Sequence, residues 1–380
     1  MGNSFLSSDV IVIGGGIAGL ATARELLRLG ARVTVLERTC GARGASWAGA
    51  GILSPLLPWD YSEPVTQLTQ LSNRLFPGFI EALRRETGVD PEYQASGILV
   101  LPASSGEVDG ARGEEPRDAR NRAAEAWCAR HAFRMRRVRS HDIAPVLARD
   151  EAALWLPEVC QVRNPRLLQA LVTAVELSGG TIIEHAEVTR WKIAQGRVQS
   201  IGTSRGDKYS AANYVVTAGA WSRQLLREYA LKLDIWPVRG QILLFKTQPD
   251  LLRTIVLQGQ DNFYLVPRQD GHILAGSTLE ETGFDKRTTA RAQKLLLAKA
   301  RALLPALTEE TLAAHWAGLR PGSPDNIPII DSHPAINNLY LNSGHYRYGV
   351  TMAPGSAHLL SNMILKKSQP LDVAPYHWPL

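Results

Sequence analysis

The sequence predicts an α/β protein in which a domain with a parallel sheet is interrupted by an α+β domain with an antiparallel sheet. Two observations favour this fold. Buried strands run directly into helices near both ends of the chain, whereas short strands separated by turns fill residues 241–276. The length of 380 residues agrees with two domains, because single hydrophobic cores seldom grow beyond about 250–300 residues.

The N-terminal stretch carries the clearest pattern. The β-branched run Asp9–Ile13 is typical of a buried parallel strand, and apolar positions at helical spacing follow in Leu20–Leu29. Gly30 fits the end of that helix, and Ala31–Leu36 is typical of a second buried strand. Strand, helix and strand in this order predict a Rossmann-like βαβ unit.

Glycines fill the turn between the first strand and the helix. Gly14 permits a tight turn, Gly16 lets the backbone approach a pyrophosphate, and Gly19 lets helix and strand pack closely. The free N–H groups and the positive dipole end of the helix would hold phosphates. Glu37, at the tip of the second strand, stands where a ribose hydroxyl would bind. The pattern predicts a dinucleotide site, and a glycine-rich turn without a ligand is the alternative.

The elements that follow are predicted from spacing and composition. Residues 41–53 are mostly small, which suits a loop beside a flat ligand or a flexible loop. Residues 103–113 have the composition of a loop, and residues 117–139 are predicted to form one long polar helix. The other elements predicted in this half are helices at 64–87, 140–143 and 165–178, and strands at 97–102, 181–183 and 186–188.

A second junction between a buried strand and a helix lies at Tyr214–Ser222. Small residues fill it, and such a turn sits at the carboxyl edge of the sheet, where α/β proteins bind ligands. The elements predicted from here onward are helices at 222–229, 289–304 and 353–367, and strands at 241–245, 263–267, 273–276 and 339–342.

The composition, 45% hydrophobic and 21% charged, is that of an ordinary soluble globular protein. The net charge of +6 is densest in Arg112–Arg139, where acidic residues are interleaved, so we expect a solvated helical face rather than a nucleic-acid site. Three separated cysteines predict neither a disulfide framework nor a metal cluster. With no signal peptide and no long apolar segment, we expect a cytoplasmic protein without a membrane span.

Six ordered blocks resemble the D-amino acid oxidase family of FAD-dependent oxidoreductases, and within it the glycine oxidase type associated with thiamine biosynthesis. The likeness covers almost the whole chain, and its blocks are Gly14–Glu37, Ser46–Ile52, Ala218–Ser222, Tyr264–Arg268, Ala317–Pro321 and Gly344–Gly349. It implies an FAD-binding domain made of residues 1–93, 160–232 and 318–380, and a substrate-binding domain made of residues 94–159 and 233–317.

The resemblance also implies which residues hold FAD. Val188 would meet the adenine through its backbone, and the loop and helix start near the C-terminus would hold the pyrimidine end of the flavin. The cofactor-binding residues implied in this way are Gly14, Gly15, Gly16, Ile17, Ala18, Gly19, Glu37, Arg38, Ala45, Ser46, Ala50, Gly51, Ile52, Val188, Ala218, Gly219, His345, Tyr346, Arg347, Tyr348, Gly349, Val350 and Thr351.

For the substrate, Arg320 resembles the family's carboxylate-binding arginine, and Arg347 resembles a second arginine of the same pocket. Tyr264 matches a tyrosine that reaches the carboxylate, and Leu279 stands where a methionine would line the pocket. A guanidinium can hold a carboxylate through two parallel hydrogen bonds. The resemblance implies oxidative deamination of glycine, sarcosine or a small D-amino acid to a 2-oxo acid, ammonia and hydrogen peroxide, with no general base.

Two other functions stay open. A flavin dehydrogenase acting on D-amino acids or proline would pass electrons to a quinone instead of dioxygen, and the basic surface would then dock on a membrane. A non-enzymatic nucleotide-binding protein would keep the fold without the activity. A homo-oligomer is compatible with each of these functions, and covalent attachment of the flavin is not expected because no cysteine follows Cys160.

Overall fold

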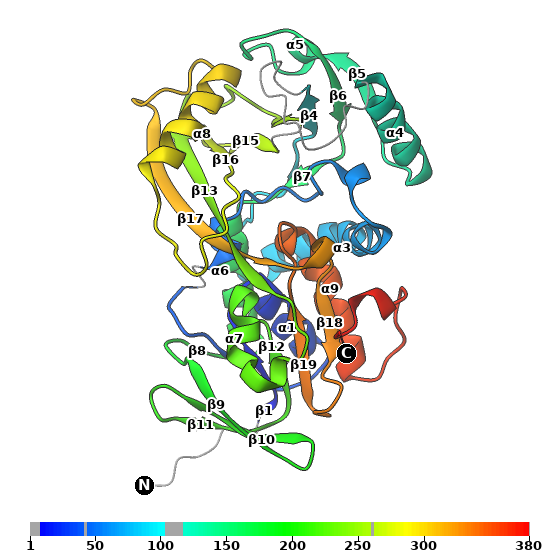
Figure 1. The fold of residues 1–380 in the computed structure, drawn as a ribbon, viewed down its shortest axis with the longest axis vertical. Helices are drawn as coiled ribbons and strands as arrows, with labels where there is room; N and C mark the ends of the chain where they lie inside the picture. Colours follow the sequence, from blue (N-terminus) through cyan, green and yellow to red (C-terminus); the bar gives the residue numbers. More distant parts are fainter. Residues whose placement is uncertain (1–7, 42–43, 103–116, 260–261, 380) are drawn as a thin grey trace.

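The structure, a computed structural model, describes residues 8–41, 44–102, 117–259 and 262–379. Within these residues, two large sheets occupy opposite ends of the molecule (Figure 1). A six-stranded sheet has the order β18-β19-β12-β1-β2-β8, and an eight-stranded sheet has the order β17-β13-β16-β15-β14-β4-β6-β5. Helices and smaller sheets cover their faces.

The six-stranded sheet is parallel except at one edge. β1 lies in the middle and pairs in parallel with β2 and β12, and only β18 runs antiparallel to its neighbour β19. The parallel pairing of β1 with β2 agrees with the predicted Rossmann-like βαβ unit, and the sheet adds one antiparallel edge strand. The strands are β1 Ser8–Ile13, β2 Val33–Leu36, β8 Thr181–Ile183, β12 Ala211–Val216, β18 Ile329–Ser332 and β19 Leu339–Ser343.

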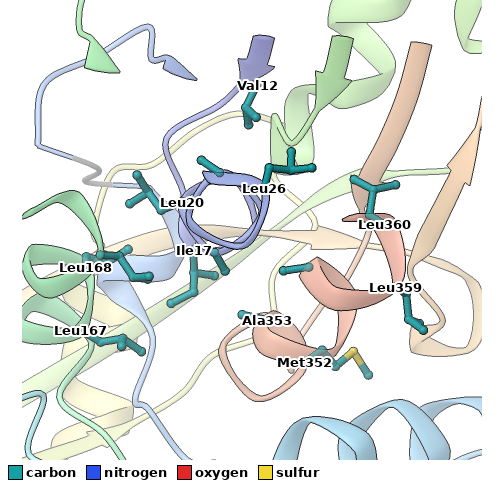
Figure 2. Close-up of a cluster of buried hydrophobic side chains, with 14 of the residues drawn as sticks. Val12, Ile17, Leu20, Leu26, Leu167, Leu168, Met352, Ala353, Leu359 and Leu360 are labelled. Atoms are coloured by element: carbon teal, nitrogen blue, oxygen red, sulfur yellow. The ribbon is translucent and has the colours of Figure 1, made fainter. Parts of the chain in front are cut away.

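Four helices share one hydrophobic core with a face of this sheet. They are α1 Ile17–Arg28, α3 Glu63–Thr87, α6 Asn164–Leu177 and α9 Gly349–Ile364. Figure 2 shows α1 in the centre of this core, with side chains of α6 on one side and of α9 on the other. Because α1 is buried on this side, the glycine turn before it is held firmly against the sheet. The labelled side chains that form this contact are Val12, Ile17, Leu20, Leu26, Leu167, Leu168, Met352, Ala353, Leu359 and Leu360.

The other face of the sheet has its own core. A three-stranded antiparallel sheet packs there with the short helix α7 Ser222–Leu226, and Leu226 lies in that core. The prediction placed a strand only at residues 186–188, so most of this small sheet was missed. Its strands are β9 Val188–Ala194, β10 Arg197–Thr203 and β11 Lys208–Tyr209.

The eight-stranded sheet is mainly antiparallel, with one parallel pair between β4 and β14. Helix α8 Ala290–Leu303 packs its apolar face on this sheet. A two-stranded sheet joins β3 Gln94–Ala95 to β7 Cys160–Gln161. The strands are β4 Ile98–Leu101, β5 Arg136–Arg139, β6 Ala152–Leu156, β13 Trp236–Lys246, β14 Ile255–Gln258, β15 Phe263–Pro267, β16 His272–Gly276 and β17 Leu312–Gly322.

Two predicted helices differ from the structure. The single polar helix predicted at residues 117–139 is wrong, because α4 spans only Arg117–Arg130 and residues 136–139 form β5, which pairs with β6. Helix α9 begins at Gly349, four residues earlier than predicted, and contains Pro354. The predicted loop at residues 103–113 lies outside the described residues, and α5 Ser140–Ile143 forms as predicted.

The strands of the two large sheets divide along the predicted ranges: the six-stranded sheet falls within residues 1–93, 160–232 and 318–380, and the eight-stranded sheet mostly within the others. β17 alone crosses a predicted boundary, and the boundaries themselves stay a prediction. None of the described helices combines the length and the apolar character needed to cross a membrane. Among the described residues, no group of three or more His, Cys, Asp or Glu side chains could hold a metal ion.

Candidate active site

A cavity of about 600 Å³ runs from the glycine turn to the end of β17. Elements far apart in the sequence line it, and they come from both large sheets. They are the turn before α1, the tip of β2, the loop around α2 Ala45–Ala48, the end of β12, the end of β17 and the loop before α9. The predicted dinucleotide turn and the predicted substrate arginine therefore open onto one continuous space.

The glycine turn is packed so closely that side chains cannot replace Gly14 or Gly19. Gly14 has φ +119°, and a Cβ there would lie 2.6 Å from the Thr217 carbonyl oxygen. A Cβ on Gly19 would lie 1.9 Å from the carbonyl oxygen of Gly14. These distances are far below van der Waals contact, so the turn and α1 keep their positions only with glycine at both sites.

The first turn of α1 and the tip of β2 are joined by hydrogen bonds. The Gly15 amide donates to Glu37 Oε2 at 2.7 Å, and the amide and hydroxyl of Thr39 donate to Glu37 Oε1 at 2.9 and 2.7 Å. The Ile17 amide donates to Ser46 Oγ at 3.0 Å. Glu37 is thus fixed beside the turn and lines the cavity, as the predicted ribose-binding acid would.

The cavity wall beyond Glu37 carries an aromatic contact. The Arg38 guanidinium carbon lies 3.6 Å from the centre of the Trp221 ring, at the end of the second strand-to-helix junction. Val188, at the start of β9, lines the same part of the cavity. The pair is a cation–π contact, and nucleobases stack on aromatic rings and guanidinium planes of this kind.

Polar atoms buried in the cavity wall test whether a flavin fits there. Asn164 Oδ1, Asn342 Oδ1 and His345 Nε2 are buried and have no hydrogen-bond partner among the described residues. All three residues line the cavity. Buried polar groups are almost always satisfied, and the ring of a flavin carries both donors and acceptors along its polar edge. The residues present therefore fit a flavin nucleotide.

Arg320 projects from β17 into the opposite end of the cavity. Its Nη1 donates to the Thr278 carbonyl oxygen at 3.1 Å, and its Nη2 donates to Ser277 Oγ at 2.7 Å. Burial lowers the pKa of Arg320, Tyr264 acts in the opposite direction, and Arg347 lowers the pKa again. The guanidinium lies against Gly240 of β13, where a Cβ would be 2.1 Å from Nη1.

A polar network behind Arg320 fixes the segment that holds it. Glu280 Oε1 accepts hydrogen bonds from Gln241 Nε2 at 2.8 Å and from Thr278 Oγ1 at 2.5 Å. Glu280 Oε2 accepts from Arg239 Nη2 at 2.5 Å, and the side chain of Arg239 is only 6% exposed. The backbone that binds Arg320 is therefore anchored to β13 by a buried ion pair.

Arg347 and three tyrosines complete this end. Tyr264 and Arg347 line the cavity next to Arg320, and the hydroxyls of Tyr348 and Tyr61 contact one another. Burial lowers the pKa of Arg347, but the surrounding tyrosines, Tyr348 first, together raise it by more. The net shift of this pKa is therefore upward. Burial lowers the pKa of His345 to about 4, so this imidazole is neutral near pH 7.

Nearly all of the predicted site residues line the cavity. Gly15 and Gly19 do not line it; Gly15 binds Glu37 and Gly19 packs on Gly14. The structure corrects the prediction for Leu279, whose side chain is 48% exposed and lies outside the cavity lining. Thr278 and Glu280 on either side of it bond to the backbone of β13, and successive side chains of an extended segment point in opposite directions. The roles of the others in binding FAD or substrate stay predictions.

Sequence reasoning missed several residues of the site. Asn164 at the start of α6 and Thr217 at the end of β12 gave no local signal, because their contacts come from distant segments. Arg268 was included only in the block Tyr264–Arg268, and no role was predicted for it. It is buried and donates to the Ala50 and Val162 carbonyl oxygens at 2.6 and 3.0 Å, and burial lowers its pKa to about 10.

Comparisons with known proteins show the family of the chain. Residues 9–363 match the family described as "FAD dependent oxidoreductase". The chain is 40% identical to the glycine oxidase of Pseudomonas aeruginosa over 98% of both chains. The structure is similar to that of glycine oxidase from Geobacillus kaustophilus, with a TM-score of 0.90, 28% identity and 98% of each chain covered.

A second solved structure extends the comparison. Iminodiacetate oxidase from Chelativorans sp. BNC1 has a TM-score of 0.85 and 27% identity, with 97% of this chain and 98% of that chain covered. The family match extends over nearly the whole length of the chain. The chain belongs to the D-amino acid oxidase family of FAD-dependent oxidoreductases.

Proposed function

We propose that the chain is an amino acid oxidase that deaminates glycine or another small amino acid. The observation that carries the proposal is the position of Arg320, a half-buried arginine whose side chain lines the cavity leading from the glycine turn. Its bonds go to a carbonyl and a hydroxyl rather than to a carboxylate. Its positive charge is therefore available to a substrate carboxylate.

The residues of the chain bind and orient the reactants. Ser277 and Thr278 hold the guanidinium of Arg320, and Tyr264 lies beside it, so a carboxylate bound there has one fixed orientation. Gly14–Gly19, Glu37 and the loop containing Ser46 would hold the nucleotide. Bound FAD would supply the oxidation of the amine, with dioxygen as the final electron acceptor and hydrogen peroxide as its product.

His345 is a weak base, because burial lowers its pKa to about 4, and we propose no proton transfer to it. Nothing in the geometry favours quinone over dioxygen as the acceptor, and the similar proteins named above are oxidases. The name of the Chelativorans enzyme supports a site that also accepts substituted amines. The link to thiamine biosynthesis implied by the resemblance is part of the same proposal.

Stopped-flow reduction of the FAD-loaded enzyme tests this function. Without oxygen, glycine, sarcosine or D-alanine is expected to bleach the flavin absorbance, and in air the same substrate is expected to give hydrogen peroxide. Arg320→Ala is expected to weaken substrate binding about 10- to 100-fold, because charged hydrogen bonds contribute about 1.5–3 kcal/mol. Bleaching without peroxide, with reduction of an added quinone, would favour the dehydrogenase instead.

A further inference from the structure

Arg268 carries a buried positive charge that the proposed reaction does not use. The residue is only 6% exposed, and its guanidinium donates to Gln161 Oε1 at 2.5 Å. It also donates to the carbonyl oxygens of Val162 and Ala50, at 3.0 and 2.6 Å. All three acceptors are neutral groups. Among the described residues, no carboxylate is bonded to this guanidinium.

Two acidic side chains near Arg268 are bound to another arginine. Glu92 and Asp270 act on Arg268 from a distance, but Arg163 Nη1 binds them directly, at 3.0 and 2.8 Å. Burial lowers the pKa of Arg268 to about 10, so the guanidinium is still cationic at pH 7. A buried charge held by neutral oxygens is costly. Because a neutral donor would satisfy the same three acceptors, the hydrogen bonds alone do not account for the charge.

The Ala50–Gly51 peptide connects this charge to the cavity. Its carbonyl oxygen accepts the hydrogen bond from Arg268, and its N–H points the opposite way because the peptide is trans and planar. Gly51 is buried and lines the cavity, and its amide has no hydrogen-bond partner among the described residues. Buried N–H groups are almost always paired. This amide is therefore available to a bound ligand.

Arg268 lies near the end of the cavity that contains the substrate arginine. Burial lowers the pKa of both Arg268 and Arg320, and Tyr264 raises both, so Tyr264 lies close to each of them. Tyr264 and Arg320 line the cavity. A flavin ring has to lie within reach of the substrate that it oxidises. The charge of Arg268 is therefore close to the place of the ring rather than to the glycine turn.

We propose that Arg268 is a positioning residue that raises the reduction potential of bound FAD through the Ala50–Gly51 peptide. A neutral amine that gives up two electrons and one proton becomes an iminium cation, and the flavin ring gains one negative charge. A cation bonded to the peptide oxygen polarises the peptide and makes the Gly51 N–H a stronger donor. The reduced cofactor is then stabilised more than the oxidised one. The proposal deepens the oxidase function and rests on it, but it holds for any amino acid substrate.

Gln161→Glu tests the charge while the shape of the site is kept. Glutamate has the size of glutamine, retains an acceptor for Arg268 and neutralises its guanidinium. The reduction potential of the FAD-loaded enzyme, titrated against a redox dye without amino acid, is expected to fall. The equilibrium constant for reduction is expected to change about 10- to 100-fold, which is about 30–60 mV for a two-electron couple. Arg268→Met is expected to lower the potential by a similar amount, and Arg268→Lys to keep most of it.

Two control variants separate the charge from the position of the loop. Gln161→Leu removes the same hydrogen bond but keeps the charge, and it is expected to weaken FAD binding while lowering the potential far less. Arg24→Met removes an arginine that is 7% exposed, bound to Glu86 and outside the cavity lining, and it is expected to leave the potential unchanged. Any variant that loses FAD on purification is titrated with oxidised and with reduced FAD, because the ratio of the two dissociation constants reports the same shift.

An unchanged potential in Gln161→Glu overturns the proposal. So does a fall in Gln161→Leu as large as that in Gln161→Glu, because the position of the loop would then set the potential. Since the titration uses no amino acid, it is independent of the proposed activity. An enzyme whose flavin the dye system reduces but no amino acid reduces would refute the oxidase function, and the result on Arg268 would stand.

Discussion

The Arg320 guanidinium lies directly against the backbone of Gly240, on the neighbouring strand β13. A Cβ at Gly240 would lie 2.1 Å from Nη1 and 2.2 Å from Nη2 of Arg320. In the β13–β17 register Gly240 pairs with Gly318, and Arg320 pairs with Val238. The arginine side chain therefore crosses diagonally over a position that only glycine leaves open.

Gly240→Ala is expected to push Arg320 out of its place and to weaken substrate binding about 10- to 100-fold, which is the contribution of charged hydrogen bonds. Gly240 does not have a positive φ, so the backbone tolerates alanine and the fold is retained. Binding is measured by flavin absorbance. Gly78→Ala in α3, where a Cβ meets open space, is the control and is expected to bind normally. Normal binding by Gly240→Ala would show that Arg320 does not hold the substrate.

Gly19→Ala is expected to give a protein with little or no bound FAD. The new Cβ would lie 1.9 Å from the Gly14 carbonyl oxygen, so the turn and α1 must separate. The measurement is the ratio of flavin to protein absorbance after purification, followed by titration with FAD. Circular dichroism shows whether the fold is kept. A folded variant with a full complement of FAD would contradict the role given to this turn.

Removing one partner of the buried Arg239–Glu280 pair is expected to destabilise the protein. Glu280→Ala leaves the buried Arg239 with Asp285 at 3.5 Å as its remaining carboxylate, and the expected cost is about 3 kcal/mol. Urea unfolding measures the change. The double variant Arg239→Met with Glu280→Leu is expected to recover much of the loss, because no charge is then buried alone. Arg253→Ala, in an exposed pair, is expected to change stability by less than about 1 kcal/mol.

His345 is expected to make the protein less stable in acid. Its pKa is about 4 in the folded protein and 6.5 in the unfolded chain, so the unfolded state binds more protons between these values. Stability is then full above pH 6.5 and falls as the pH drops towards 4. Thermal unfolding of the FAD-loaded enzyme from pH 7 to pH 5 measures this slope. His345→Gln is expected to flatten it, and an unchanged slope would assign the acid sensitivity to other groups.

Much of the nucleotide half of the fold was predictable because its signals are local. Asp9–Ile13 is apolar and β-branched, and the glycines that follow leave few alternatives to a tight turn. The strand β5 was missed because Arg136–Arg139 is charged, and its strand form depends on pairing with β6. β9 shows the alternation of buried and exposed residues that marks a strand, with Trp191 and Ile193 on one face, so its signal was present and overlooked.

Site residues were predictable where the type of side chain itself suggests its ligand. They were not predictable where a residue acts through contacts with segments far away in the sequence. Arg320 followed from a family pattern, whereas Gly240, which makes room for it, is an ordinary strand glycine in the sequence. Leu279 was misplaced because a matched position in the sequence does not give the direction in which its side chain points. Asn164 acts through Ser46, more than a hundred positions away.

Arg268 has a consequence for engineering this enzyme. Its guanidinium, at the end of β15, holds the carbonyl oxygens of Ala50 and Val162 and the side chain of Gln161. In a chimera whose eight-stranded sheet comes from a relative, the loop that contains Ala50 is expected to keep its position only if Gln161 and Arg268 come from the same protein. The two residues thus form one inheritable unit, because without Gln161 the buried guanidinium of Arg268 keeps only the backbone carbonyl oxygens of Ala50 and Val162 as acceptors.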